Sequence, residues 1–364
     1  FIVYAIAPIL YNLGIIFGIL WLVPRFGYMG LAYGVVLGAF LHMMVQIPSV
    51  FALGYKYRMH FNLRHPALKR MALLLVPRVL GIASQQIAVL MNTNIASTLA
   101  VGSIAVLNLG DNLVSLPISI FGISFAVAVF PTLTEKYTLQ KIDEFKQDVI
   151  RTLRQILFLT LPSMMLYWLL RAQIVRLAYG AGQFSWEDTR FTVSVLAFLA
   201  FGMWAQAIIP LLARSFYALQ DTKTPFFTGL AALGINLLGA WLLIGRYHVV
   251  GLAMAIGLSS MANAIILFWM LQKRLGKLPL QELTVAILKF IGGSAAMGLA
   301  GYGALQAMSW IINTHTFIGL FTQTLVAFII AALVYLVIMR QWRVPEMALI
   351  SRLLNKLFRR TAAE

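Results

Sequence analysis

Three polar residues recur in an otherwise apolar stretch of the chain, and their types suit the binding of a phosphate group. Arg78, Gln85 and Asn92 are spaced seven residues apart, which places all three near one face of a helix. An Arg guanidinium can bind a pyrophosphate through two parallel hydrogen bonds. Pro77 directly precedes Arg78 and is expected to kink or open the helix. We therefore predict that Arg78 contacts phosphate and that Gln85 and Asn92 share its site.

A second polar stripe follows in the next apolar stretch. Its members are spaced i, i+3, i+4 and i+7 and are Asn108, Asp111, Asn112 and Ser115, with Ser119 one turn further on. Lipid does not tolerate such a face, so it is expected to line the bundle interior or a wet cavity. The alternative is structural: Arg78 pairs with Asp111, and the amides link helices by hydrogen bonds. Both interpretations stay open, because substrate can open a salt bridge.

Two further candidates are isolated. Arg214 lies near the end of an apolar stretch and is predicted to bind phosphate or, as the favoured alternative, to snorkel or cap the helix. His42 is a lone histidine that a neighbour is expected to satisfy. The apolar stretches hold no cluster of Asp, Glu or His, the chain has no Cys, and no Gly-rich nucleotide loop is present. The sequence thus predicts no metal, no cofactor, no ATP-driven step and no enzyme.

The composition requires a membrane around these stripes. Of 364 residues, 61% are hydrophobic and only 11% are charged, and the mean hydropathy is +0.87. A soluble domain carries about 25% charged residues, so soluble classes are excluded. The net charge of +17 comes from Lys and Arg in short loops between apolar runs, as in inner-membrane proteins. We expect contacts with membrane lipids and none with nucleic acid.

The elements that position the stripes are ten predicted membrane-spanning helices, since about 20 apolar residues cross the hydrocarbon core. They cover 2–23, 28–53, 70–99, 102–132, 152–172, 189–219, 224–245, 248–272, 283–308 and 316–340. Twenty basic loop residues fall on one side of this topology and five on the other. The positive-inside rule then predicts a cytoplasmic C-terminus. Segments 137–150 and 344–360 are predicted to be interfacial: a helical connector and a basic amphipathic helix on anionic lipid. The alternative for both is a solvated linker.

Part of the chain repeats. Asn12-Leu-Gly, Arg25-Phe and Gly30-Leu-Ala in 2–53 match Asn236-Leu-Leu-Gly, Arg246-Tyr and Gly251-Leu-Ala in 224–272. Transporters are often built from such repeats, with the substrate site at the repeat interface. If these helix pairs correspond, about 150 residues forming four further spans are expected before residue 1, giving fourteen spans in two lobes. The chain, which begins inside an apolar run, is therefore expected to be truncated.

Several motifs resemble those of the MurJ/MviN family of lipid II flippases, in the MOP exporter superfamily. They are Ala5-Ile-Ala-Pro-Ile-Leu-Tyr-Asn12, Phe130-Pro-Thr-Leu133, Gly182-Gln-Phe-Ser-Trp-Glu-Asp-Thr189 and Leu211-Leu-Ala-Arg-Ser-Phe-Tyr-Ala-Leu-Gln-Asp-Thr-Lys-Thr-Pro225. The resemblance implies an all-α, polytopic, two-lobe MOP/MATE-like bundle in the bacterial inner membrane. It also implies that undecaprenyl-pyrophosphate-linked muropeptide is moved to the outer face by alternating access. A groove at the last two helices would hold the lipid tail.

On this resemblance the chain is divided into five parts. The last two helices of the first lobe take 1–53, a basic cytoplasmic linker 54–70, a six-helix second lobe 71–272, two extra helices 273–340 and an amphipathic tail 341–364. The stripe at Gly110-Asp-Asn-Leu-Val-Ser-Leu-Pro117 departs from the family pattern, because Asn112 replaces an Arg and Ser115 an acidic residue. One hypothesis is that Arg78 supplies the missing charge. The alternatives are another exporter of the superfamily and a non-transporting scaffold of wall synthesis; the coupling ion stays open.

Overall fold

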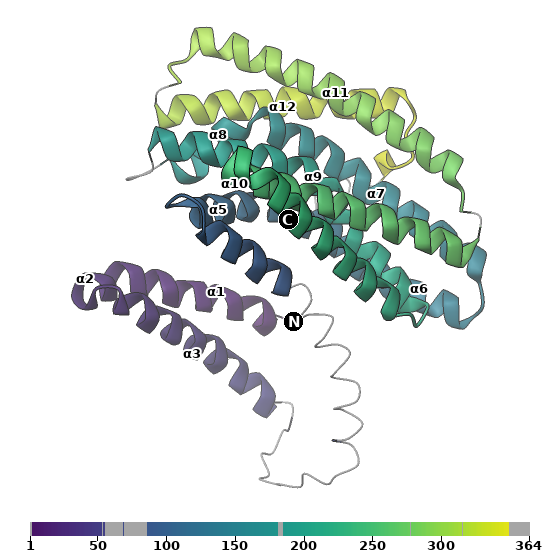
Figure 1. The fold of residues 1–364 in the computed structure, drawn as a ribbon, viewed down its shortest axis with the longest axis horizontal. Helices are drawn as coiled ribbons and strands as arrows, with labels where there is room; N and C mark the ends of the chain where they lie inside the picture. The colour runs from purple at the N-terminus through teal and green to yellow at the C-terminus, as the bar shows by residue number, and fades with distance from the viewer. Residues whose placement is uncertain are drawn as a thin grey trace, which may run out of the picture. The chain divides into compact units, whose positions relative to one another are not determined.

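The computed structural model describes residues 2–52, 54, 68, 86–180, 185–276, 278–314 and 316–348. Throughout these residues the regular structure is helical and no strand occurs (Figure 1). The chain forms two compact units, Phe1–Leu75 and Val76–Glu364. The prediction of an all-α helical bundle is confirmed.

The first unit is a helical hairpin held by glycines. One arm runs through α1 (Ile2–Phe17), the π-helical η1 (Gly18–Leu22) and α2 (Val23–Phe26), and the other is α3 (Met29–Ala52) (Figure 1). A Cβ added to Gly14 would lie 2.4 Å from the Cα of Gly38, and one added to Gly18 would lie 2.5 Å from the Cα of Gly34. The two backbones therefore touch, the approach that small residues permit between membrane helices.

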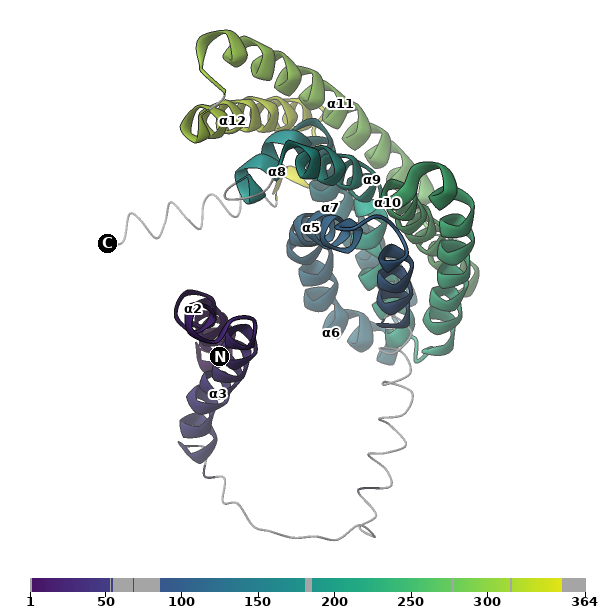
Figure 2. The same ribbon diagram turned by 60° about the vertical axis from the view of Figure 1, so that its left-hand side comes forward.

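The second unit is a bundle arranged around one central helix. Its members are helical residues 86–97, α5 (Ser103–Pro117), η2 (Ile118–Ile123), α6 (Ser124–Thr138), α7 (Ile142–Leu169), α8 (Arg171–Tyr179), α9 (Trp186–Ala218), α10 (Lys223–Leu275), α11 (Leu280–Ile311) and α12 (Phe317–Gln341). The long helix α9 is the most buried and packs against α5, α6, α7, α8 and α10. The α11–α12 hairpin packs mainly on α7 (Figure 2). Helix α9 is therefore the core of the second unit, and α5 is one of the helices that pack on it.

Eight helices among the described residues are long and apolar enough to span a membrane. One of them, α10, has 53 residues, so at ~1.5 Å per residue it is more than twice as long as the hydrocarbon core is thick. Its backbone leaves the helical conformation at His248, with φ 50° and ψ −132°. Helix α10 is therefore long enough for two spans, and the predicted break between spans 224–245 and 248–272 is confirmed. The predicted span 70–99 lies mostly outside the described residues, which show helix from 86 to 97.

The internal repeat is confirmed in the backbone. Gly27, which joins the two arms of the first hairpin, has φ 58° and ψ −145°, close to the values at His248, 221 residues later. A Cβ on Gly30 would meet the backbone of Leu22, and one on Gly251 would meet the backbone of Leu243, at the same separation of 221. Two helical hairpins of the chain are therefore built with one turn geometry and one close glycine contact.

The repeat allows a prediction about His248. A side chain is strained in the conformation that His248 adopts, whereas glycine adopts it freely, and its counterpart is Gly27. We expect His248→Gly to raise the free energy of unfolding by about 1 kcal/mol. Thermal unfolding in lipid nanodiscs measures the change. Gly27→Ala is the reciprocal variant and is expected to lower the unfolding temperature; a gain there would contradict the shared turn.

The predicted connector 137–150 is helical, but most of it is not a separate element. Helix α7 already begins at Ile142, and Phe145 and Val149 are fully buried in the core, because they extend its apolar face. Lys136 at the end of α6 lies 2.6 Å from Asp148 and binds the two helices together. The prediction that 137–150 is helical is confirmed except at the turn 139–141, and its interfacial placement stays a prediction. The predicted amphipathic segment 344–360 lies mostly outside the described residues.

Candidate functional site

The polar stripe of α5 lies on the face opposite its packing face. Val106, Leu113 and Val114 are buried, and a Cβ on Gly110 would lie 3.1 Å from the Val195 side chain of α9. The polar residues are all exposed within the second unit: Asn108, Asp111, Asn112 and Ser115. The four residues therefore share one face of α5, and the expectation that this face lines the bundle interior or a wet cavity stays a prediction. Among the described residues, no Lys or Arg forms an ion pair with Asp111.

Two tyrosines hold the α5 backbone behind this stripe. The Leu113 carbonyl lacks its usual helical donor, because the residue four positions later is Pro117. The Tyr167 hydroxyl of α7 donates to that carbonyl at 3.0 Å, and the Tyr179 hydroxyl of α8 donates to the Leu109 carbonyl at 3.2 Å. The proline thus turns a helix carbonyl into an attachment point, and the attachment fixes the orientation of the stripe.

The other stripe is only partly described. Arg78 and Gln85 lie outside the described residues, so the alternatives of a phosphate contact and an Arg78–Asp111 pair both stay predictions. Asn92 is half-buried, and its Oδ1 has no hydrogen-bond partner. Ala96, one turn further along, is buried in the same apolar cluster as Val106 of α5. This helix therefore packs in the same cluster as α5.

Arg214 lies near the C-terminal end of α9, and the alternative that it snorkels or caps the helix stays a prediction. Its guanidinium is half-buried, and Nη1 donates to the Pro210 carbonyl at 3.3 Å in the preceding turn. This contact is local and does not exclude a phosphate contact, which stays a prediction. His42 lies within hydrogen-bond distance of Gln46 at 3.4 Å and meets the Tyr11 ring edge-on. The expectation that a neighbour satisfies His42 is confirmed.

The motif after Arg214 builds the α9–α10 turn. Gln220 adopts φ 58° and ends α9, since the Asp221 N–H donates back to the Phe216 carbonyl. The Asp221 carboxylate then accepts from the backbone N–H groups of Lys223 and Thr224, both at 3.0 Å. Burial opposes the charge on Asp221, but these bonds and nearby Arg274 outweigh it and hold the pKa of the carboxyl below its ordinary value. Arg274 lies near the far end of α10, beyond the break at His248. Its closeness to Asp221 shows that the start of the first half of α10 and the end of the second half lie on the same side of the bundle.

Three buried amide groups were not among the site residues that the sequence predicted, although Asn236 belongs to the internal repeat. The Oδ1 atoms of Asn236 and Asn263 and the Nε2 atom of Gln206 have no hydrogen-bond partner among the described residues. All three are in α9 and α10, where a polar residue inside an apolar span was the available signal. Buried amides of this kind need a partner, so they can bind water or a polar group of a substrate.

A cavity of about 440 Å³ lies where the α11–α12 hairpin meets the end of α7 and the start of α8. Trp168, Leu169 and Arg171 line one wall, and Tyr302, Leu305 and Gln323 line the other. Arg171 stacks over the Trp168 ring at 5.2 Å. The cavity therefore combines apolar surface with one cation.

A family model described as "Lipid II flippase MurJ" matches residues 1–321. The chain belongs to the MurJ family. It is 28% identical over 317 residues to the probable lipid II flippase MurJ of Vibrio cholerae, covering 86% of this chain and 59% of that protein. It is 27% identical to the lipid II flippase MurJ of Burkholderia cenocepacia, covering 74% and 54%. The chain thus spans little more than half the length of these relatives.

A solved structure agrees with this assignment at the level of the fold. The structure described as "Lipid II flippase MurJ, inward closed conformation" matches with a TM-score of 0.75 at 22% identity, covering 93% of this chain and 68% of that one. Together with the eight apolar helices, the MurJ match makes this chain a multi-pass membrane protein with the MurJ helical fold.

Proposed function

We propose that the protein containing this chain is a lipid II flippase of the inner membrane. It carries undecaprenyl-pyrophosphate-linked muropeptide from the cytoplasmic to the outer face by alternating access, with no covalent chemistry. The observation that carries the proposal is the MurJ family match over residues 1–321. The polar face of α5 supports it, because an exposed carboxylate among amides in a membrane span suits a polar cargo.

The proposed substrate contacts come from two helices and one helix end. Asn108, Asp111, Asn112 and Ser115 of α5 hydrogen-bond the sugar and peptide groups, since amides and hydroxyls can both donate and accept. Arg78 binds the pyrophosphate, with Gln85 and Asn92 beside it. Arg214 is the second phosphate candidate.

The proposed topology places the C-terminus in the cytoplasm. Twenty basic loop residues against five support this direction. The contacts support the alternation of the spans, because Arg154, close to the start of the apolar part of α7, lies near Glu282 at the start of α11 and near Glu346 beyond the end of α12. In this division 1–53 ends the first lobe, 54–70 is the linker, 71–272 is the second lobe, 273–340 adds two helices and 341–364 is the tail. The cavity between these two helices and α7–α8 is the proposed place of the lipid tail.

The test is replacement of an essential flippase. The full-length protein is expressed in a bacterium depleted of its own MurJ, and lipid II reaching the outer leaflet is measured by enzymatic cleavage from outside. We expect growth and outward lipid II to be restored. Export of another polyprenyl-linked sugar or a drug, with no lipid II movement, would favour another exporter. Restored growth with no lipid movement of any kind would favour a scaffold.

A further inference from the structure

A buried ion pair joins two parts of the chain that are 192 residues apart in sequence. Nε of Arg154, in α7, lies 2.8 Å from Oε1 of Glu346, and Nη2 donates to Oε2 at 3.2 Å. The Glu346 side chain is only 5% exposed and that of Arg154 15%. A carboxylate so enclosed needs its cation, because an unpaired buried charge is strongly destabilising.

The turn that carries Glu346 is shaped to return toward α7. Arg343 adopts φ 51° after the end of α12, and the N–H of Val344 donates back to the Met339 carbonyl at 3.0 Å. This is a helix-terminating motif in which the following apolar residue packs back, and Val344 is indeed buried. The reversal brings Glu346 onto α7 at Arg154.

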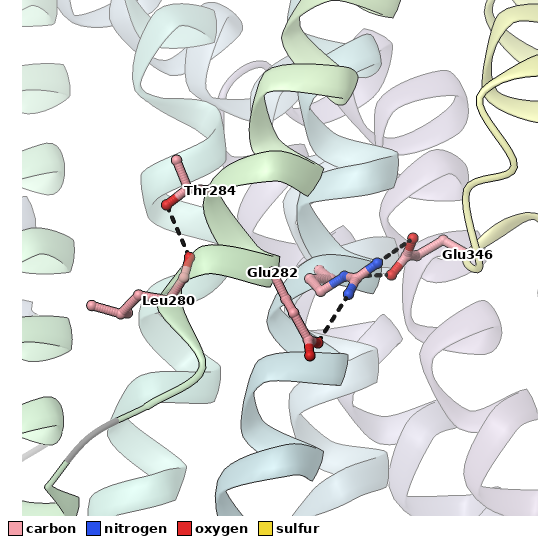
Figure 3. A network of polar contacts seen from close by, with 5 residues as sticks. Leu280, Glu282, Thr284 and Glu346 are labelled. Carbon is pink, nitrogen blue, oxygen red and sulfur yellow. Dashed lines mark hydrogen bonds and ion pairs between the residues drawn. The ribbon is translucent and has the colours of Figure 1, made fainter.

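A second carboxylate approaches the same guanidinium. Oε2 of Glu282, at the start of α11, lies 3.8 Å from Nη1 of Arg154, and its side chain is 70% exposed. Figure 3 shows the carboxylates of Glu282 and Glu346 reaching one guanidinium from different sides. Arg154 thus holds the buried acid through one hydrogen bond from Nη2 and the close approach of Nε, which makes no hydrogen bond of its own, and meets the exposed acid only loosely through Nη1.

Space for a movement adjoins Arg154 and Glu282. A cavity of about 340 Å³ is lined by Arg154, Glu282, Val285, Lys289, Val344 and Pro345. Lys289 of α11 donates to the Trp342 carbonyl at 3.1 Å. The turn is therefore also attached to its own hairpin partner, and that attachment does not involve Arg154.

We propose that Arg154 is a latch that holds the 342–348 turn on α7 and releases it by passing from Glu346 to Glu282. In the closed state the guanidinium binds Glu346 and buries it. In the released state Glu282 keeps Arg154 paired, while Glu346 leaves its enclosed position and enters water with the turn. The exchange never leaves the cation unpaired, so releasing the C-terminal segment costs less than breaking an isolated buried pair.

The test combines four forms of the full-length protein in nanodiscs: the unaltered protein, Glu282→Gln, Glu346→Gln and the double variant. Hydrogen exchange of the 342–348 backbone reports release, and the unfolding temperature reports the loss of charge compensation. We expect Glu346→Gln to speed exchange about tenfold or more. We expect Glu282→Gln alone to change it by less than about twofold, as for exposed pairs. The double variant is expected to lose more thermal stability than the two single losses together.

A matched control is Lys141→Gln, which breaks an exposed ion pair with Glu144 at the start of the same helix and is expected to change neither measurement. If both single variants fold and only the double variant fails to fold, the loss is also more than additive, and this outcome supports the exchange. Additive single losses would overturn the exchange, because Glu282 would then not substitute for Glu346. Unchanged exchange of the turn in Glu346→Gln would overturn the latch itself.

Discussion

Gly202→Leu is expected to destroy the central packing of the second unit. Gly202 of α9 and Gly257 of α10 are both buried, and a Cβ on Gly202 would lie 2.8 Å from the Cα of Gly257. That atom belongs to the backbone, so no side-chain rotation can relieve the clash. We expect a loss of about 3 kcal/mol or more in the free energy of unfolding, at the upper end for overpacked cores. Thermal unfolding in nanodiscs, together with the yield of folded protein, measures the effect.

Gly229→Leu provides the control for this prediction. Gly229 lies in α10 as well, but a Cβ added there meets nothing within 4 Å. The same change of residue also improves helix propensity, so its unfolding temperature is expected to stay the same or rise. Equal stability of Gly202→Leu and Gly229→Leu would show that α9 and α10 do not pack through this contact.

Asp111→Asn is expected to lower lipid II transport about tenfold or more without lowering stability. A charged side chain within a membrane span costs about 3 kcal/mol, a cost that only function or an ion partner offsets, and no described residue forms an ion pair with Asp111. The side chain is exposed in the second unit, so its loss removes no core contact. Initial rates of lipid II appearance at the outer face give the measurement, with the unfolding temperature alongside.

The control for Asp111 makes the same chemical change elsewhere. Asp143 is an exposed carboxylate in the first turn of α7, and Asp143→Asn is expected to leave transport unchanged. Wild-type transport by Asp111→Asn would contradict a substrate role for this charge. Lower transport that accompanies lower stability would instead favour the structural alternative, in which Asp111 pairs with Arg78. Arg78→Ala tests the role of Arg78 directly, because unchanged transport in this variant would show that Arg78 does not contact the substrate.

Features that depend on neighbours along the chain could be predicted from the sequence. Hydrophobic runs identified nine of the spans, including the break at His248, because helix length and membrane thickness are local constraints. The spacing of Asn108, Asp111 and Ser115 predicted one polar face, since helical periodicity alone places them together. The repeat was also visible, because glycines at equivalent positions serve the same close contacts in both hairpins.

Features that join distant parts of the chain were decided only by the tertiary structure. The full burial of Phe145 and Val149 is one example, because it depends on the surfaces that pack against α7 and not on the local sequence. Two further contacts depend on which helices pack together and on their relative axial shift. They are the hydrogen bond from Tyr167 to the carbonyl of Leu113, which Pro117 leaves without a helical donor, and the Arg154–Glu346 ion pair. Charge, periodicity and hydropathy do not encode that register. It follows from shape complementarity between packed helices, where single contacts such as Gly202 on Gly257 set the distance.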